Sequence, residues 1–438
     1  METKIVALSE LCKISGRVGW KGYTVDDLRE DGPLVIGAND IDSNHQLDLK
    51  EVKHISREKY EESPEIMIDK YDILIVKVGS TIGKVAIVDQ DLGEACINPN
   101  TVLLKNCKIN PFYVYYTLIS SYGQSFLLNN SSASAQPALN QTTLKEMPIH
   151  LPADENWINN ITTSLNRINN KIKLNNRINR ELEAMAKTLY DYWFVQFDFP
   201  NEQGKPYKSS GGKMVYNAEL KREIPEGWEV KPINTKVKIG SGFPFNSDDY
   251  SDTGKYKIIT IKNVQEGYLE TSSVDYVSFL PNNISAFCIL KEGDILMSLT
   301  GNVGRMCFVD QSNLLLNQRV GKLLGEKDFV TYAYFFFKRP ENQKRLEKIA
   351  GGSSQANLSP IDAVKDKFPI PTASVLNNFT QLVNPLLNQI LIKNQENQHL
   401  TALRDWLLPM LMNGQVTGNE AEESLSMAAE PSVEYKKG

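Results

Sequence analysis

The stretch KVGSTIGKVAIV, residues 77–88, combines two glycines with a lysine, which are the residue types that cradle phosphate in nucleotide-binding loops. A P-loop places four residues between its glycines and follows its lysine with Ser or Thr, whose hydroxyl holds magnesium. The loop then opens into a helix, so that backbone N–H groups point at the phosphates. Here three residues separate Gly79 from Gly83, Val85 follows Lys84, and the next residues are strand-like. The stretch therefore does not match a nucleoside triphosphate site.

A second copy of this stretch favours a structural role for the glycines. In GNVGR, residues 301–305, only two residues separate Gly301 from Gly304, and the basic residue is Arg305. A phosphate cradle would not keep its geometry through that change of loop length. Glycines between two apolar, alternating runs are typical of a β-hairpin, so both stretches predict a turn with a basic residue at its exit. The alternative is that Lys84 and Arg305 are simply solvated.

Other stretches that resemble catalytic motifs lack the surroundings that the chemistry needs. NPFY, residues 110–113, is similar to the loop with which amino-methyltransferases hold a flipped adenine, but no Gly-rich S-adenosylmethionine motif precedes it. We expect Asn110 to cap a helix instead, with Pro111 in the first turn. KIGSGF, residues 238–243, is not a dinucleotide fingerprint because no helix pattern follows it. The sequence thus predicts no catalytic residues, and two similar domains favour recognition.

Composition and cysteine usage indicate a globular protein of a reducing compartment. The chain has 438 residues, of which 41% are hydrophobic and 23% charged, and its length suggests two or three domains. The sequence contains no run of about 18 apolar residues, so it predicts no membrane span. The N-terminus does not resemble a signal peptide, and we expect a cytoplasmic protein. The cysteines lack CxxC spacing and are all expected to be buried free thiols: Cys12, Cys96, Cys107, Cys288 and Cys307.

The ionisable residues give no support for a metal site. Only four histidines are present, and none lies in an array such as HExxH, so we predict no metal ligands. The formal net charge of -5 does not favour nucleic-acid binding either. Local basic patches matter more than the sum, however, so the charge does not exclude it.

The chain is an internal repeat of long period. Matching stretches lie about 220 residues apart, at 71–89 and 293–310, at 134–152 and 353–371, and at 96–104 and 315–324. A period this long indicates a duplicated domain. Each copy alternates short β-rich runs with Gly, Pro, Asn and Asp, which predicts an α+β domain with mostly antiparallel strands. We expect one helix at 111–128 in the first copy and one at 328–350 in the second.

A long helical pattern with a heptad seam follows each copy. The apolar seam residues are Ile161, Leu165, Ile168, Ile172, Leu182 and Leu189 in the first helix and Phe379, Val383, Leu386, Ile390, Leu400 and Leu407 in the second. Polar residues interrupt the seam at matching places, Asn175 and Asn179 in the first helix and Lys393 and Asn397 in the second. Polar residues at core positions reduce stability but fix register, so we expect the two helices to form a coiled coil. The alternative is two helices that pack separately on their own domains.

These patterns divide the chain into domains and spacers. We expect a first repeated domain at 1–152, a central helix at 153–198, a linker at 199–223, a second repeated domain at 224–372, a C-terminal helix at 373–416 and a tail at 417–438. The tail is acidic, aperiodic and rich in small residues, which predicts disorder.

Two α+β domains that are each followed by a long helix resemble the specificity subunit of type I restriction–modification systems. The resemblance lies in DILIVKVGSTIGKVAIV and DILMSLTGNVGRMCFV, in SAQPALN and SSQANLS, in IPEGWEV at 224–230, and in LTALRDWLLPMLMNGQV at 400–416. It implies two target-recognition domains, each reading one half of a split double-stranded DNA target, on an antiparallel coiled coil. It also implies a non-catalytic subunit that binds two modification (methyltransferase) subunits and restriction (translocase/nuclease) subunits. S-adenosylmethionine, ATP and magnesium would belong to those partners, leaving this chain without a cofactor.

Recognition of bases and phosphates requires Asn, Gln, Arg, Lys, Ser and Thr on loops. The candidate DNA-binding residues are Lys77, Ser80, Thr81, Lys84, Ser134, Gln136 and Asn140 in the first domain and Thr300, Asn302, Arg305, Gln318, Arg319, Ser354 and Gln355 in the second. Each could instead stabilise a turn. Two rival functions are a DNA methyltransferase with its own recognition domain, and a coiled-coil scaffold whose domains bind protein.

Overall fold

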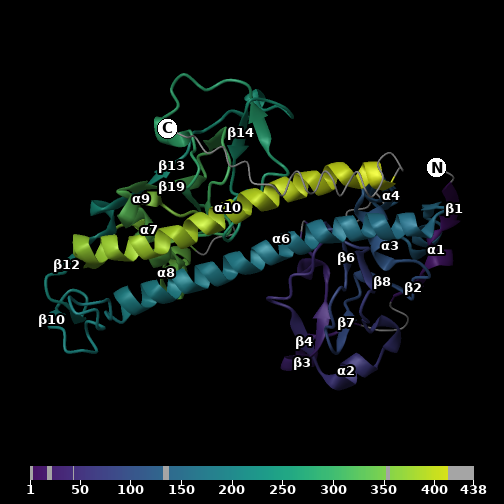
Figure 1. The fold of residues 1–438 in the computed structure, drawn as a ribbon, viewed down its shortest axis with the longest axis horizontal. Helices are drawn as coiled ribbons and strands as arrows, with labels where there is room; N and C mark the ends of the chain where they lie inside the picture. The colour runs from purple at the N-terminus through teal and green to yellow at the C-terminus, as the bar shows by residue number, and fades with distance from the viewer. Residues whose placement is uncertain (1–2, 17–21, 43, 132–137, 352–355, 413–438) are drawn as a thin grey trace. The chain divides into compact units, whose positions relative to one another are not determined.

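The chain divides into two compact units, one formed by residues 1–170 and 400–438 and the other by residues 171–399. The computed structural model describes residues 3–16, 22–42, 44–131, 138–351 and 356–412, and the predicted tail at 417–438 lies outside this part. Two long helices, α6 (Glu155–Tyr190) and α10 (Ala373–Met412), contribute to both units (Figure 1). Among the described residues, no helix is both long enough and apolar enough to cross a bilayer.

Three small sheets form the globular part of the first unit. β1 (Thr3–Ala7) pairs with β9 (Pro148–Pro152). A four-stranded sheet has the order β2 (Lys13–Ser15), β8 (Thr101–Lys105), β5 (Ile73–Val76) and β6 (Val85–Ile87). A three-stranded sheet has the order β4 (Lys53–Ile55), β3 (Leu28–Ile36) and β7 (Ala95–Ile97). Only β3 and β7 are parallel among these pairs, so the sheets are mostly antiparallel, as predicted.

The second unit repeats these sheets strand for strand. β12 (Glu229–Pro232) pairs with β20 (Lys367–Ile370). The four-stranded sheet has the order β13 (Val237–Ser241), β19 (Val320–Gly325), β16 (Ile295–Ser298) and β17 (Met306–Phe308). The three-stranded sheet has the order β15 (Asp275–Val277), β14 (Tyr256–Ile259) and β18 (Leu314–Leu316), with β14 and β18 parallel. The predicted α+β duplication is confirmed, and the hairpin β10 (Met214–Asn217) with β11 (Arg222–Pro225) stands outside it.

Each globular part contains a pair of helices where the sequence predicted one. α3 (Pro111–Ile119) precedes α4 (Ser121–Asn129), and α7 (Lys327–Lys338) precedes α8 (Pro340–Ala350). The chain is extended at Ser120 and at Arg339, with ψ of 162° and 138°. Arg339 precedes a proline, which disfavours helical backbone, and the Ser120 hydroxyl caps α4 by accepting from Gly123 N. The prediction of single helices over 111–128 and 328–350 is therefore wrong.

Shorter helices complete the two globular parts. They are α1 (Leu8–Leu11), α2 (Arg57–Glu61), α5 (Gln141–Lys145) and α9 (Pro360–Ala363). At the start of α3, the Asn110 side chain accepts from Phe112 N at 3.1 Å, and Pro111 occupies the first turn. Asn110 is thus the helix cap that the sequence predicted.

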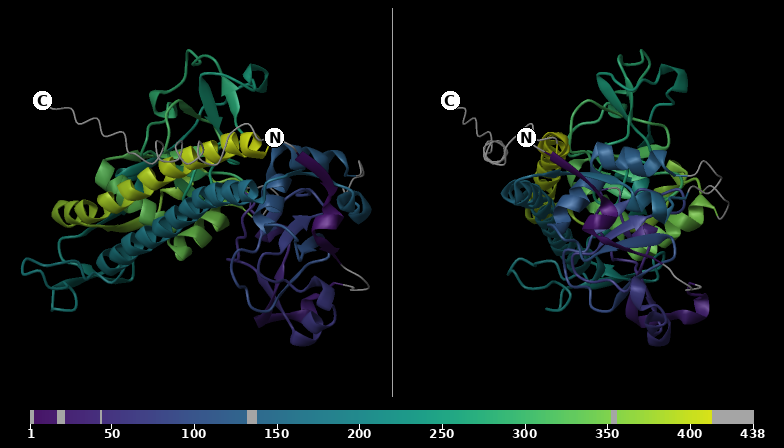
Figure 2. Two further views of the ribbon diagram at one scale, coloured as in Figure 1. Left: turned by 45° about the vertical axis from the view of Figure 1, so that its right-hand side comes forward. Right: turned by 90° about the vertical axis from the view of Figure 1, so that its right-hand side faces the viewer.

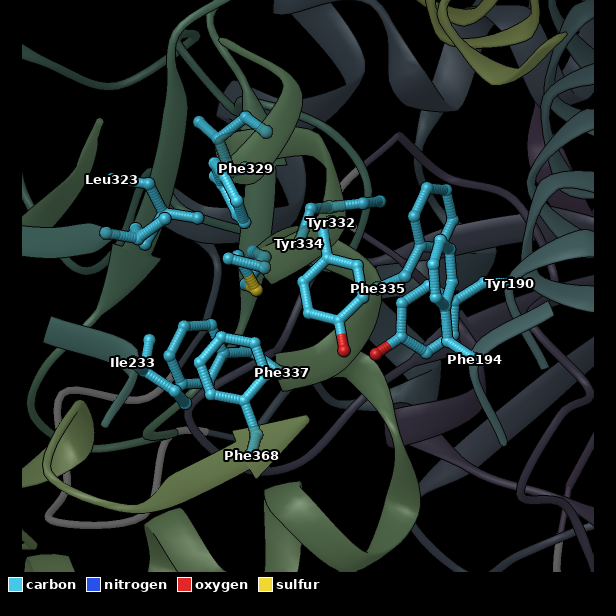
Figure 3. Packing of buried hydrophobic residues seen from close by; sticks show 14 of the residues in the cluster. Tyr190, Phe194, Ile233, Leu323, Phe329, Tyr332, Tyr334, Phe335, Phe337 and Phe368 are labelled. Carbon is cyan, nitrogen blue, oxygen red and sulfur yellow. The ribbon is translucent and has the colours of Figure 1, made fainter. Parts of the chain in front are cut away.

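Aromatic side chains fasten the long helices to the globular part of the second unit. Tyr190 ends α6, Phe194 lies just after it, and both pack beside Tyr332 and Phe335 of α7 (Figure 3). The ring centroid of Phe194 lies 4.8 Å from that of Tyr332 and 4.8 Å from that of Phe379, which is on α10. Aromatic pairs at such distances contribute about 0.5–1.5 kcal/mol beyond their burial. The C-terminal end of α6 and the N-terminal end of α10 therefore share one core with α7.

Within the second unit, α6 and α10 run antiparallel. Asn175 Nδ2 donates to Asn397 Oδ1 at 2.9 Å, and Asn179 Nδ2 donates to Asn394 Oδ1 at 2.8 Å. Moving forward along α6, from Asn175 to Asn179, therefore means moving backward along α10, from Asn397 to Asn394. Both views of Figure 2 show these segments of the two helices side by side. The sequence pattern placed Lys393 at this contact, but its neighbour Asn394 makes it, while Lys393 pairs with a glutamate of its own helix.

The predicted seam positions are all buried or part-buried. In the first unit Ile161 and Leu165 are fully buried, and in the second unit Phe379 and Val383 are. Leu189 of α6 is part-buried against the core that contains Phe379 and Val383. Burial of this kind is expected of a heptad seam and also of helices that pack on their own domains. The coiled coil itself stays a prediction.

The cysteines differ from the expectation at two positions. Cys12 and Cys107 form a disulfide with their Cα atoms 4.2 Å apart, so the prediction of free thiols throughout is wrong. The cause is a tertiary pairing: β2 follows Cys12 directly and pairs with β8, which ends just before Cys107. Cys96, Cys288 and Cys307 are buried free thiols, as predicted.

Candidate nucleic-acid interface

The two glycine-containing stretches form tight turns between antiparallel strands. The first turn joins β5 to β6, and the second joins β16 to β17. Gly83 N donates to Val76 O at 3.0 Å, and Gly304 N donates to Ser298 O at 2.9 Å. The φ angles of Gly83 and Gly304 are 88° and 83°, a region that glycine enters without a steric penalty. The predicted hairpins are confirmed, and the strand after each basic residue rules out a P-loop.

In the first unit, main-chain hydrogen bonds join the hairpin to two neighbouring loops. The carbonyl of Lys77 accepts from Leu139 N at 2.8 Å, and Lys77 N donates to Asn100 O at 2.8 Å. Asn100 lies in the turn after β7, and Leu139 lies in the segment before α5. The hairpin therefore lies between these two loops.

The second unit repeats this arrangement bond for bond. Leu299 takes the place of Lys77: its carbonyl accepts from Leu358 N at 2.7 Å, and its N–H donates to Arg319 O at 3.1 Å. Arg319 lies after β18, and Leu358 lies before α9. In each unit, a main-chain frame thus brings three loops together, namely the hairpin, the turn after β7 or β18, and the segment before α5 or α9.

These loops contain all the candidate residues that the structure describes. They are Lys77, Ser80, Thr81, Lys84 and Asn140 in the first unit and Thr300, Asn302, Arg305, Gln318 and Arg319 in the second. Ser134, Gln136, Ser354 and Gln355 lie outside the described residues. The sequence pattern had selected separate stretches, and the fold gathers them into one cluster of loops in each unit.

Solvent exposure separates the candidates. Ser80, Asn140, Asn302, Gln318 and Arg319 are exposed, whereas Lys77, Thr81, Lys84 and Arg305 are half-buried. Thr300 is 6% exposed, and its buried hydroxyl makes no hydrogen bond with the described residues. Exposed amides, hydroxyls and guanidinium groups are those that pair with base edges and phosphates. The five exposed candidates are therefore better placed than Thr300 for a contact with DNA.

The basic residue at each hairpin exit ties the turn to another part of its unit. Lys84 Nζ donates to the carbonyl of Ile41, and Arg305 Nη1 donates to Gln265 Oε1 at 3.0 Å. With its amide oxygen turned toward the guanidinium, Asn302 also accepts from Arg305 Nη2 at 3.0 Å. Neither basic residue is simply solvated. Within the described chain no carboxylate forms an ion pair with Arg305.

A part-buried histidine supports the exit of the first hairpin. His45 Nδ1 accepts from Val85 N at 3.1 Å, and the carbonyl of His45 accepts from the Tyr115 hydroxyl at 3.0 Å. Burial disfavours the imidazolium and lowers the pKa of His45 to about 4, so the ring is neutral and can accept at neutral pH. The sequence carried no sign of this role, because an isolated histidine has no motif.

Two asparagines that the sequence analysis missed shape the turn beside each hairpin. Asn98 Oδ1 accepts from Asn100 N and from the Thr101 hydroxyl, both at 3.0 Å. Asn317 Oδ1 accepts from Arg319 N at 3.4 Å. Such turns are typical of asparagine, whose side chain bonds to the backbone two residues on. The match between the repeats around these residues was the available signal.

The candidate side chains of the cluster are suited to binding a polar partner. The described candidate side chains are amides, hydroxyls and cations, which donate to or accept from polar and anionic groups. Across the described ranges, no three His, Cys, Asp or Glu side chains gather as a metal site would require. The arrangement can therefore hold a polar, anionic surface in a defined register.

Comparison with known proteins finds the same repeat. A family model described as a type I restriction modification DNA specificity domain matches residues 2–184 and 225–402. The MjaIX specificity subunit of Methanocaldococcus jannaschii, a type I restriction enzyme subunit, is 28% identical over 318 residues, covering 70% of this chain and 69% of the relative. The HindI specificity subunit of Haemophilus influenzae is 22% identical over 467 residues, covering 91% and 99%. The crystal structure of a type I restriction–modification S subunit from M. genitalium aligns with a TM-score of 0.53 at 14% identity, over 94% of this chain and 96% of that chain.

Proposed function

Because this chain belongs to the type I restriction–modification DNA specificity family, we propose that each repeated domain reads one half of a bipartite double-stranded DNA target. The family supplies the DNA-recognition component of type I restriction–modification enzymes and is not itself catalytic. Methylation and cleavage then belong to other subunits of the complex.

One observation carries the proposal: the same three loops meet in both units, joined by equivalent main-chain hydrogen bonds. A split target requires two reading surfaces of one design, because each half of the DNA is recognised separately. Base discrimination uses amides and guanidinium groups that bond to groove edges, and phosphate contacts use cations and hydroxyls. We assign these roles first to the exposed Ser80 and Asn140 in one domain and to Asn302, Gln318 and Arg319 in the other.

The long helices are proposed to set the distance between the half-sites as a coiled coil. About 30 paired residues would span roughly 45 Å at 1.5 Å per residue, on the order of 13 base pairs of B-DNA. In this proposal the target-recognition domains are 1–152 and 224–372, the spacers are 153–198 and 373–416, and 199–223 is a linker. A stiff spacer is needed because a flexible linker would not fix the gap.

The spacer is also proposed to bind two modification subunits and, through the complex, restriction subunits. S-adenosylmethionine, ATP and magnesium would act on those partners. The net charge of -5 disfavours strong phosphate binding by this chain alone, so most of the electrostatic affinity would come from the assembled complex.

A domain exchange tests the proposal. Residues 1–152 are replaced by the corresponding domain of another specificity subunit, and the chain is expressed with its modification subunits. Base-resolved mapping of methylated adenine in cellular DNA should show one half of the target changed and the other half and the gap retained. A change in both halves would contradict independent reading by the two domains.

A further inference from the structure

We infer that Gln124 and Gln343 are positioning residues that hold the turn of each reading hairpin in place, an inference that rests on the proposed function. In the first unit, Gln124 lies on α4 near its start. Its Nε2 donates to the carbonyl of Gly83 at 3.0 Å and to the carbonyl of Leu118 at 2.9 Å. One amide therefore connects the hairpin turn to the end of α3.

The second unit contains the same connection, made by the glutamine at the matching place on α8. Gln343 Nε2 donates to Gly304 O at 3.0 Å and to Phe337 O at 2.8 Å. The hairpin turns differ in length between the units, and the side chains around them differ too. An identical pair of contacts in both copies therefore indicates a shared requirement at the turn.

The helix break explains why a glutamine is suited to this place. The chain leaves the helical conformation at Ser120 and at Arg339, so the last carbonyls of α3 and α7 lose the N–H donors that a continuing helix would supply. Leu118 and Phe337 provide such carbonyls. A primary amide has two N–H bonds, one for the helix carbonyl and one for the hairpin carbonyl.

The glutamine also packs directly against the turn. A Cβ atom added at Gly304 would lie 2.6 Å from Gln343 Oε1, and one added at Gly83 would lie 3.4 Å from Gln124 Oε1. These glycines immediately precede Arg305 and Lys84. Because both amide hydrogens are used on main-chain carbonyls, the glutamines act on DNA only through the hairpin that they hold.

Two readouts on the full chain test this inference. The variants are Gln343→Met and Gln343→Glu, which retain the side-chain size but cannot donate, and the same changes at Gln124. Hydrogen exchange of the hairpin amides should become on the order of tenfold faster, but only in the unit that carries the change, since one lost hydrogen bond shifts a local equilibrium by about that factor. Exposed Gln203 in the linker provides the matched control, Gln203→Met.

The second readout is the methylation map of cells that express the variants with the modification subunits. Changes at Gln343 should relax base preference in one half of the target, and changes at Gln124 in the other half. Gln343→Lys retains N–H donors and should restore part of the preference. A purely structural role would lower the amount of folded protein and methylation at all sites equally.

The outcomes separate the inference from the function on which it rests. If hairpin exchange is unchanged, or if both hairpins and both half-sites respond to one variant, the positioning role is wrong. If the unmodified chain directs no sequence-specific methylation, the proposed function fails instead. In that case, unit-specific exchange would still support the contact between glutamine and hairpin as a positioning device.

Discussion

Replacing the buried carboxylate of Asp310 with an amide is expected to stabilise the protein at neutral pH and to leave its stability in acid nearly unchanged. Asp310 lies just after β17 and is 3% exposed. Within the described chain its Oδ1 accepts no hydrogen bond. Burial disfavours the ionised form and raises the pKa of Asp310 from 3.8 to about 6.

The raised pKa of Asp310 determines the sign and the size of the change in the free energy of unfolding. Because the pKa of Asp310 is higher in the folded state, folding is favoured when the carboxyl is protonated. The stabilisation from the protonated carboxyl is fully present below about pH 4, is lost as the pH rises to about 6, and is absent above it. A shift of about two pKa units corresponds to about 3 kcal/mol. Asp310→Asn should therefore raise the free energy of unfolding by up to about 3 kcal/mol at pH 8 and by less than about 1 kcal/mol at pH 4.

Urea unfolding of the full chain at pH 4, 6 and 8 measures the effect. Asp89 occupies the place of Asp310 in the first repeat and is part-exposed, so Asp89→Asn is the matched control. The control should show a much smaller gain at pH 8. An equal gain at all three pH values, or a loss at pH 8, would refute the argument, because neither can come from ionisation of a buried carboxyl.

Two further predictions concern contacts between distant parts of the chain. In a double-mutant cycle, Asn175→Leu and Asn397→Leu should be coupled by about 1 kcal/mol in urea unfolding, since either change alone removes the hydrogen bond between Asn175 Nδ2 and Asn397 Oδ1. Additive effects would show that the pair does not fix the helices. Cys107→Ser should lower the free energy of unfolding by about 2–4 kcal/mol under oxidising conditions, because the disulfide to Cys12 closes a long loop. With excess reductant, the variant and the unmodified chain should unfold alike, and a difference that persists would mean that packing rather than the cross-link is responsible.

The features that the sequence predicted correctly are those that a pattern of residue types along the chain indicates directly. The duplication is visible because matching stretches recur at one interval. The hairpin at Gly83 could be predicted because glycines lie there between two apolar, alternating runs, and the structure gives Gly83 the positive φ that glycine tolerates. Asn110 could be recognised as a helix cap from its type and from the proline that follows. At the hairpin and at the helix cap, neighbours in sequence make the decisive interaction.

The features that could not be predicted depend on partners far away in the chain. The disulfide of Cys12 follows from the pairing of β2 with β8, which no cysteine spacing encodes. Asn394 rather than Lys393 meets α6, and the Asn394 amide also donates to the distant carbonyl of Gly267 at 3.4 Å. The apolar pattern runs through Ser120 without a signal strong enough to predict the break in the helix there. Gln124 has a role only because that break leaves a carbonyl within its reach.

The frame beneath the candidate interface explains how one fold can present different side chains. The contacts that gather the three loops are made by main-chain atoms, so they survive when the side chain changes. Lys77 in the first unit stands where Leu299 stands in the second, and Asn100 stands where Arg319 stands, yet the same carbonyls and N–H groups pair. A side-chain contact that recurs in both units, made by Gln124 and by Gln343, is also directed at main-chain carbonyls. Residues that point away from this frame can therefore vary without loss of the loop arrangement, which would let each domain read its own half-site under the proposed function.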